Sequence, residues 1–250
     1  MLVKQSSKVL LVLALAACGC ESKKTDSTAP TPASNAAAPG ATPETATKST
    51  SAPAAEKKSY PSPEKFDIAP LAVGQWIRML VKTVGQPPAQ TFIRIVGKEG
   101  DSFWYEIESN TPNGTTVIQL LMDDVTKGNF SKGSIKKIKM KVGLAPVQEF
   151  SGPAMAAVSA MTDNYVAMFG RPNLDKAERG DASVNAGEFK GCYIHEIDQS
   201  VMGMSMKVKS WNHPAVPING FVRSEGLANN AKTTTELYEM HMDGAKSVLQ

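Results

Sequence analysis

The 250-residue chain is poor in cysteine and histidine, with three of each. Three cysteines cannot build a disulfide-dense fold, and no Cys-x-x-Cys pair offers a redox or zinc site. The histidines, His195, His213 and His241, show no His-Glu-x-x-His spacing. The run 203–207 lacks the final glycine of a nucleophile elbow, and no glycine-rich phosphate loop occurs. We therefore expect a protein that is not an enzyme and that needs no cofactor.

The chain also lacks a strong charge of either sign and has few long apolar runs. Its formal net charge is +3, but residues 61–250 hold 20 basic and 20 acidic residues. A neutral domain does not favour nucleic-acid binding. Only one strongly apolar run is present, at the N-terminus, which excludes a polytopic helical membrane protein.

That single run has the features of a secretory signal peptide. Lys4 and Lys8 precede the apolar residues 9–17, a stretch too short to span a bilayer. The run ends in Leu-Ala-Ala-Cys, which resembles a bacterial lipobox in which Cys18 is diacylated and becomes the mature N-terminus. Acyl chains at Cys18 would anchor the protein to a membrane. By the rule known for enteric lipoproteins, Gly19 indicates the outer membrane, with the domain facing the periplasm.

The next segment has the composition of a tether. Between residues 21 and 60, 28 of 40 positions are Ala, Thr, Ser or Pro, and no Leu, Ile, Val, Met, Phe or Trp occurs. Such a segment buries too little apolar area to fold, so we expect it to be disordered with a reach of about 35 Å. The predicted organisation is a signal peptide (1–17), a lipidated cysteine and tether (18–60), and a single domain (61–250).

The domain shows the two-residue alternation of half-buried strands. In 75–82, Ile77, Met79 and Val81 alternate with polar or charged neighbours. Consecutive segments joined by short turns predict an antiparallel meander. The expected strands are 75–82, 91–96, 102–108, 115–122, 135–142, 186–197, 201–211, 220–226 and 233–242, and residues 171–183 are expected to form a polar loop.

One helix is predicted between these strands. Ser151 and Pro153 suit its start, and Gly170 with the following Arg-Pro suits its end. Apolar side chains recur at helical spacing: Met155, Val158, Met161, Tyr165 and Met168. The expected fold class is α+β, a curved antiparallel sheet forming a half-open β-barrel with this helix packed on its concave face.

Methionines form stripes on two predicted strands. Met202, Met204 and Met206 alternate ahead of Trp211, and Met240 and Met242 lie near the end of the domain. Methionine suits adaptable apolar pockets. We therefore expect Met202, Met204, Met206 and Trp211 to line a cavity together with the helix. Thioethers also bind Cu(I), which leaves a copper site of Met204, Met206 and His213 as an alternative.

Two further features have ordinary structural interpretations. Lys136, Lys137, Lys139 and Lys141 form a basic patch, which we interpret as a solvated strand face guarding a sheet edge. Contact with anionic lipid head groups is the alternative. Cys192 lies deep in the domain and is expected to be a free, buried thiol.

Several segments together resemble a known group of proteins. The stretch from Trp211 to Glu225, WNHPAVPINGFVRSE, resembles a motif of uncharacterised bacterial exported lipoproteins. Similar segments are Ala186–Cys192, Val73–Trp76, Glu236-Leu237 and Gly244–Ser247. Such proteins look like relatives of the Lol lipoprotein-carrier fold, a half-open barrel with a helical plug. The resemblance implies an apolar cavity that receives acyl chains and brings no catalytic residue.

These observations predict a membrane-anchored periplasmic lipoprotein that binds a lipid or acyl chain in a half-barrel cavity. The candidate lining residues are those of the helix and of the first methionine stripe. An envelope interaction or scaffold module whose core is filled by residues 154–168 is the main alternative.

Overall fold

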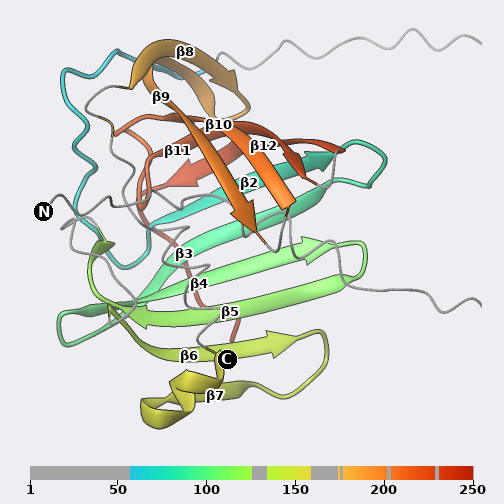
Figure 1. Ribbon diagram of the computed structural model, residues 1–250. Helices are drawn as coiled ribbons and strands as arrows, with labels where there is room; N and C mark the ends of the chain where they lie inside the picture. Colours follow the sequence, from blue (N-terminus) through green and yellow to red (C-terminus); the bar gives the residue numbers. More distant parts are fainter. Residues whose placement is uncertain are drawn as a thin grey trace, which may run out of the picture. The chain divides into compact units, whose positions relative to one another are not determined.

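The computed structural model describes residues 57–125, 134–158, 174, 177–201, 204–228 and 231–249. Twelve strands form one sheet (Figure 1). They are β1 (Ser59–Tyr60), β2 (Trp76–Thr83), β3 (Ala89–Glu99), β4 (Ser102–Thr111), β5 (Gly114–Met122), β6 (Ile135–Val142), β7 (Gln148–Ser151), β8 (Glu178–Val184), β9 (Gly187–Val201), β10 (Met204–Asn212), β11 (Phe221–Ala228) and β12 (Ala231–His241).

The sheet is curved, unclosed and largely antiparallel. Its strand order is β1-β9-β10-β11-β12-β2-β3-β4-β5-β6-β7, and β8 pairs with β9 off this path. Only the short β1–β9 pairing is parallel among the described strands. The pairing of β12 with β2 joins two meanders, β2–β7 and β9–β12, into one surface. The curved, antiparallel part of the predicted fold class is thereby confirmed.

Alternation along each strand determines the two faces of this sheet. In β2 to β4, Ile77, Ile93 and Ile107 lie opposite one another in register and are 0–5% exposed. We call the side that they occupy the inward face. Arg94 and Glu106 alternate with these residues and occupy the outer face.

The predicted helix is wrong in the part that the structure describes. Gln148–Ser151 form β7, in which Phe150 pairs with Ile138 and packs against the core. The chain then turns at Gly152, whose φ of 54° favours glycine, and continues as the 3-10 helix η3 (Gly152–Val158). The alanines that follow Phe150 therefore lie in a tighter 3-10 helix and not in the predicted α-helix. The remaining predicted helical residues, 159–170, lie outside the described residues.

Part of the predicted polar loop is a strand. Residues 178–184 form β8, in which Ala182 and Val184 are buried and alternate with exposed residues. The polar sequence at the start of β8 conceals this short alternation. Among the described residues, no helix is long and apolar enough to cross a membrane.

The C-terminal segment lies against the outer face of the sheet. Glu106 is fully buried there and accepts hydrogen bonds from Arg94 at 3.0 Å, Gln119 at 2.9 Å and Ser247 at 2.8 Å. The backbone N–H of Val248 also donates to this carboxylate. Residues 247–248 are therefore fastened across β3, β4 and β5 by one buried acidic side chain.

Candidate functional site

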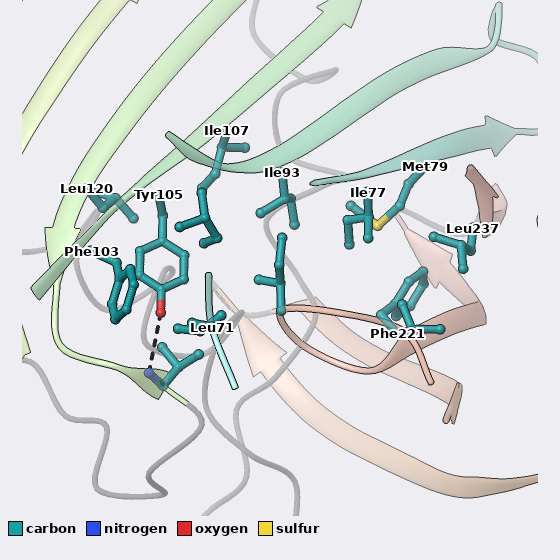
Figure 2. Packing of buried hydrophobic residues seen from close by; sticks show 14 of the residues in the cluster. Leu71, Ile77, Met79, Ile93, Phe103, Tyr105, Ile107, Leu120, Phe221 and Leu237 are labelled. Atoms are coloured by element: carbon teal, nitrogen blue, oxygen red, sulfur yellow. Dashed lines mark hydrogen bonds between the residues drawn. The ribbon is translucent and has the colours of Figure 1, made fainter. Parts of the chain in front are cut away.

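The inward face of β2–β6 is a continuous apolar surface. Tyr105, Leu120 and Ile138 lie in register on β4, β5 and β6, and all three are fully buried. Figure 2 shows Tyr105 and Ile93 pointing toward Leu71, and Phe221 and Leu237 on the far side of the same cluster. Strands from both meanders therefore contribute to one core.

Short segments, rather than another sheet, cover this part of the inward face. Leu71 comes from the chain before β2, Val125 from the chain after β5, and Val158 from η3. Val216 and Ile218 come from the connection between β10 and β11. The backbone N–H of Val125 donates to Tyr105 Oη at 3.4 Å, and burial raises the pKa of this phenol (Figure 2). The cover is thus assembled from separate pieces of chain.

The inward face of β9–β12 has a different chemistry. His195, Ser210, Ser224 and Thr235 lie opposite one another on β9, β10, β11 and β12. The three hydroxyl residues are 0–6% exposed. We call these four residues the polar row. The row ends at Val81 of β2, so it borders the apolar surface directly.

A small hydrogen-bonded group lies at one end of the polar row. The side-chain amide of Asn212 donates to Ser210 Oγ at 3.2 Å and to His195 Nδ1 at 3.2 Å. Because Nδ1 accepts, neutral His195 carries its proton on Nε2. This Nε2 atom is buried and has no hydrogen-bond partner in the part of the chain that the structure describes. Burial also lowers the pKa of His195, so the ring is held neutral with one N–H available to donate.

The polar row was missed in the sequence. Serine and threonine on a strand ordinarily suggest its solvated side, and nothing in the local sequence shows that four strands align these residues. Only the register between strands brings them together. The available signal was weak: Ser210 and Asn212 alternate on one side of β10, as do Ser224 and Gly226 on β11.

The structure describes only some of the residues predicted to line the cavity. Met155 is partly buried and Val158 is 8% exposed, and both pack against the core from η3. Met161, Tyr165, Met168 and Met202 lie outside the described residues. Met204 and Met206 belong to β10, but the structure does not describe their side chains. The two described helix residues therefore contribute to the cover of the inward face.

Trp211 lies on β10 between two cations and the core. It follows Ser210 and thus faces the other side of the strand, opposite Arg223 of β11. The cations of Lys209 and Arg223 lie 5.6 Å from the centre of its ring, while its edge contacts the core cluster. Trp211 thus packs against the buried core cluster, and its role in lining a cavity stays a prediction.

His213 stabilises the corner between β10 and β11. Its Nδ1 accepts from the backbone N–H of Ala215 at 3.1 Å, and its Nε2 donates to the carbonyl of Pro61 at 3.0 Å. The backbone N–H of His213 donates to the carbonyl of Gly220 at 2.7 Å and closes the corner. Both ring nitrogens are engaged, so this geometry does not favour His213 as a copper ligand.

Metal and thiol chemistry find little support in the described residues. No group of three His, Cys, Asp or Glu side chains there is arranged to hold a metal ion. Cys192 is free and fully buried, as predicted, and its Sγ lies 3.5 Å from the carbonyl oxygen of Phe189. Burial raises the pKa of this thiol to about 11, which disfavours the reactive thiolate.

Lysines of the predicted basic patch form ion pairs with acidic neighbours. Lys136 pairs with Asp123 at 2.8 Å, and Lys137 pairs with Glu99 at 2.7 Å. Lys139 lies over the ring of Trp104, 4.8 Å from its centre. These contacts agree with a solvated strand face more than with a lipid-binding surface.

The outer face offers one shallow groove with charged walls. It has a volume of about 280 Å³, and Glu196, Lys209 and Glu225 are among the side chains that line it. No protein-family model matches the chain, and a search of curated proteins finds no match either. Function is therefore argued from the chemistry of the inward face.

Proposed function

We propose that this chain is a membrane-anchored periplasmic lipoprotein, not an enzyme, whose half-open sheet binds a lipid or acyl chain on its inward face. Acylation of Cys18 would hold it at the outer membrane through the tether. The observation that carries the ligand proposal is that two chemistries adjoin on one face. The apolar surface of β2–β6 meets the polar row of β9–β12 at Val81.

An amphipathic molecule has these same two chemistries. An acyl chain would lie against the apolar side chains near Val81 and Leu237, where burial of methylene groups stabilises the complex. Its carbonyl or ester oxygen would accept a hydrogen bond from Nε2–H of His195 and from neighbouring hydroxyls. A buried N–H without a partner destabilises the empty protein, so an acceptor there contributes to affinity.

The inward face of β2–β6 is covered by separate short segments of the chain, and this supports the same proposal. Leu71 and Val158 belong to separate short segments rather than to strands of the sheet. Displacing one such segment breaks fewer backbone hydrogen bonds than opening a sheet. An apolar ligand can therefore replace part of the cover at modest cost.

The test is to purify the chain from residue 19 onward, extract it with organic solvent and identify the extract by mass spectrometry. The described strands all lie between residues 59 and 241, so this chain keeps the described sheet. We expect co-purified lipid, and displacement of a fluorescent fatty acid by that lipid. His195→Ala should weaken the displacement by about fivefold to tenfold, the loss of one buried hydrogen bond.

His241→Ala is the matched control, because His241 is exposed at the end of β12, where it contacts Glu239 and stacks on Trp76, away from the polar row. Its affinity for the fluorescent fatty acid should equal that of the parent chain. Protein that carries no lipid and takes up no fluorescent fatty acid would refute the ligand proposal.

The second candidate, a scaffold module with a filled core, also rests on a specific observation. Ile77, Ile93 and Leu120 have no exposed surface because the chain's own side chains cover them. A core completed in this way throughout the sheet would need no ligand. The extraction experiment separates the candidates, since a scaffold module would carry no co-purified lipid and would be fully stable without it.

A further inference from the structure

The turns at one end of the sheet form a distinct surface. Because neighbouring strands are antiparallel, the turns β2–β3, β4–β5, β6–β7 and β11–β12 all lie at the same end. Three of these turns are visible together on the right of Figure 1. We call the segments 82–89, 110–115, 141–148 and 227–233 the turn rim. Only their described residues are used below.

The turn rim exposes large apolar side chains. Leu144 is 104% exposed and Val84 is 70% exposed, and neither has a packing role in the core. Val142, Val147 and Leu227 are 45–53% exposed. Five of the nine large apolar side chains found exposed in the described chain therefore lie at this one end. Grouped exposure of this kind marks an interaction surface, whereas scattered exposure does not.

The charge of the turn rim has one sign. Its segments contain Lys82, Lys141 and Lys232 and no aspartate or glutamate. Lys82 pairs with Glu236, which lies farther along β12. The other end of the sheet, called the acidic end below, has five carboxylates in or beside its connections: Glu99, Asp101, Asp123, Asp124 and Asp243. Lysines occur at that end too, and Lys137 and Lys136 pair with Glu99 and Asp123. The turn rim therefore differs from the acidic end in having lysines without carboxylates in its segments.

The turn rim combines exposed apolar side chains with lysines and has no carboxylate in its segments. This combination suits the surface of an anionic lipid bilayer. Exposed aliphatic side chains enter the boundary between head groups and acyl chains, while lysines stay at the phosphates. The opposite end also exposes Val73 and Met242, but they lie beside Asp243. Carboxylates there would be repelled by the same bilayer.

We propose that the turn rim docks on an anionic phospholipid membrane through Leu144, Val147 and the neighbouring lysines. This contact is independent of acylation at Cys18 and of any ligand on the inward face. It orients the domain with the strand axes steep to the membrane and the acidic end away from it.

A disordered tether, as predicted from the sequence, would permit this orientation. β1 lies beside the start of β9, at the end of the sheet opposite the turn rim. A strand of eight residues such as β2 spans about 26 Å, which is less than the expected reach of the tether, about 35 Å. An anchored chain can therefore turn its rim toward the same membrane that holds Cys18.

The test measures vesicle binding of the chain from residue 19 onward, which has neither the signal peptide nor the acylated cysteine. Vesicles of phosphatidylethanolamine with phosphatidylglycerol supply the anionic surface, and pure phosphatidylcholine vesicles are compared. We expect co-sedimentation with the anionic vesicles that decreases as salt is raised. Replacing both Leu144→Ser and Val147→Ser should weaken binding about tenfold or more, and Lys141→Gln about fivefold.

The paired control is Val73→Ser with Met242→Ser, two residues at the acidic end whose exposure is close to that of Val147. Lys98→Gln is the control for charge. These variants should bind as the parent does. Equal losses from the two ends, or no binding to anionic vesicles, would overturn the proposal. Thermal unfolding of each variant checks that it is folded.

A second measurement does not depend on loss of binding. Leu144→Trp should show a blue-shifted emission component when anionic vesicles are added, since the indole enters an apolar layer. Val73→Trp should show no such shift. The inverse pattern would place the membrane at the acidic end and refute the assignment. Absence of co-purified lipid, the result that refutes ligand binding, would leave these readouts unchanged.

Discussion

At the scale of single residues, the fold keeps two histidines neutral: His195 on β9, and His213 directly after β10. His195 accepts from Asn212, and His213 accepts from the backbone N–H of Ala215. A proton added to Nδ1 of either ring would break an existing hydrogen bond and place a charge in a buried position. Burial therefore lowers the pKa of both side chains below the ordinary value of 6.5.

This shift predicts how stability depends on pH. Above pH 6.5 both rings are neutral in the folded and unfolded chains, so they make no pH-dependent contribution. As pH falls below that value, the unfolded chain takes up protons first, and the free energy of unfolding decreases through the lowered pKa values of the native rings. Urea denaturation between pH 7.5 and about pH 5 measures this slope.

The histidines can be separated from the carboxylates that also titrate in acid. His213→Gln and His195→Gln should each reduce the slope, whatever their effect on stability at pH 7.5. A slope that neither buried-site variant changes would contradict the explanation.

At the scale of elements, the C-terminal segment depends on one carboxylate. Glu106 is fully buried and joins Arg94 and Gln119 of the sheet to Ser247 and Val248 of that segment. Removing the acid leaves a guanidinium and several donors without their shared acceptor. A residue on β4 thus determines whether a segment more than a hundred positions later stays in place.

Glu106→Ala should therefore lower the free energy of unfolding by about 3 kcal/mol, as expected when one partner of a buried ion pair is removed. Glu149→Ala is the control, since its contact with Lys139 is 3.9 Å long and half-exposed, and it should cost less than about 1 kcal/mol. Urea denaturation at pH 7.5 gives both values. Equal losses for the two variants would show that burial of Glu106 carries no special weight.

The strands were largely predictable from sequence, whereas the site was not. Alternation predicts the nine segments that became β2–β6 and β9–β12, with end positions that differ by a few residues. The predicted start of the α-helix at Ser151 and Pro153 was wrong, because Ser151 ends β7 and the next residues form the 3-10 helix η3. β8 was missed because Ala182 and Val184 alone carry its apolar pattern. The polar row depends on register across four strands, which no local pattern contains.

At the scale of the whole molecule, both meanders share one core, so that core should open cooperatively. Cys192 is a natural probe of this opening. It is fully buried on β9 beside Phe189, and burial raises its pKa to about 11. A reagent in solvent reaches this thiol only when the β9 side of the core has come apart.

In the chain from residue 19 onward with Cys20→Ser, Ellman's reagent at pH 8 should react with Cys192 on the order of a thousandfold more slowly than in urea-unfolded protein. The rate should rise with low urea concentrations in proportion to the global unfolding equilibrium. Reaction at the unfolded rate in native buffer would mean that this side of the sheet opens on its own.

The pairing of β12 with β2 has a consequence for biogenesis. Lys82 and Glu236 meet across this pair although 154 positions separate them in the chain. Until residues 231–241 have arrived, the two meanders have no strand between them, and each exposes an unpaired edge. Loop closure over such a separation slows folding and prolongs the exposure of those edges. If the chain is exported as proposed, it completes its sheet only after residues 231–241 have been translocated, and until then it would depend on protection from aggregation.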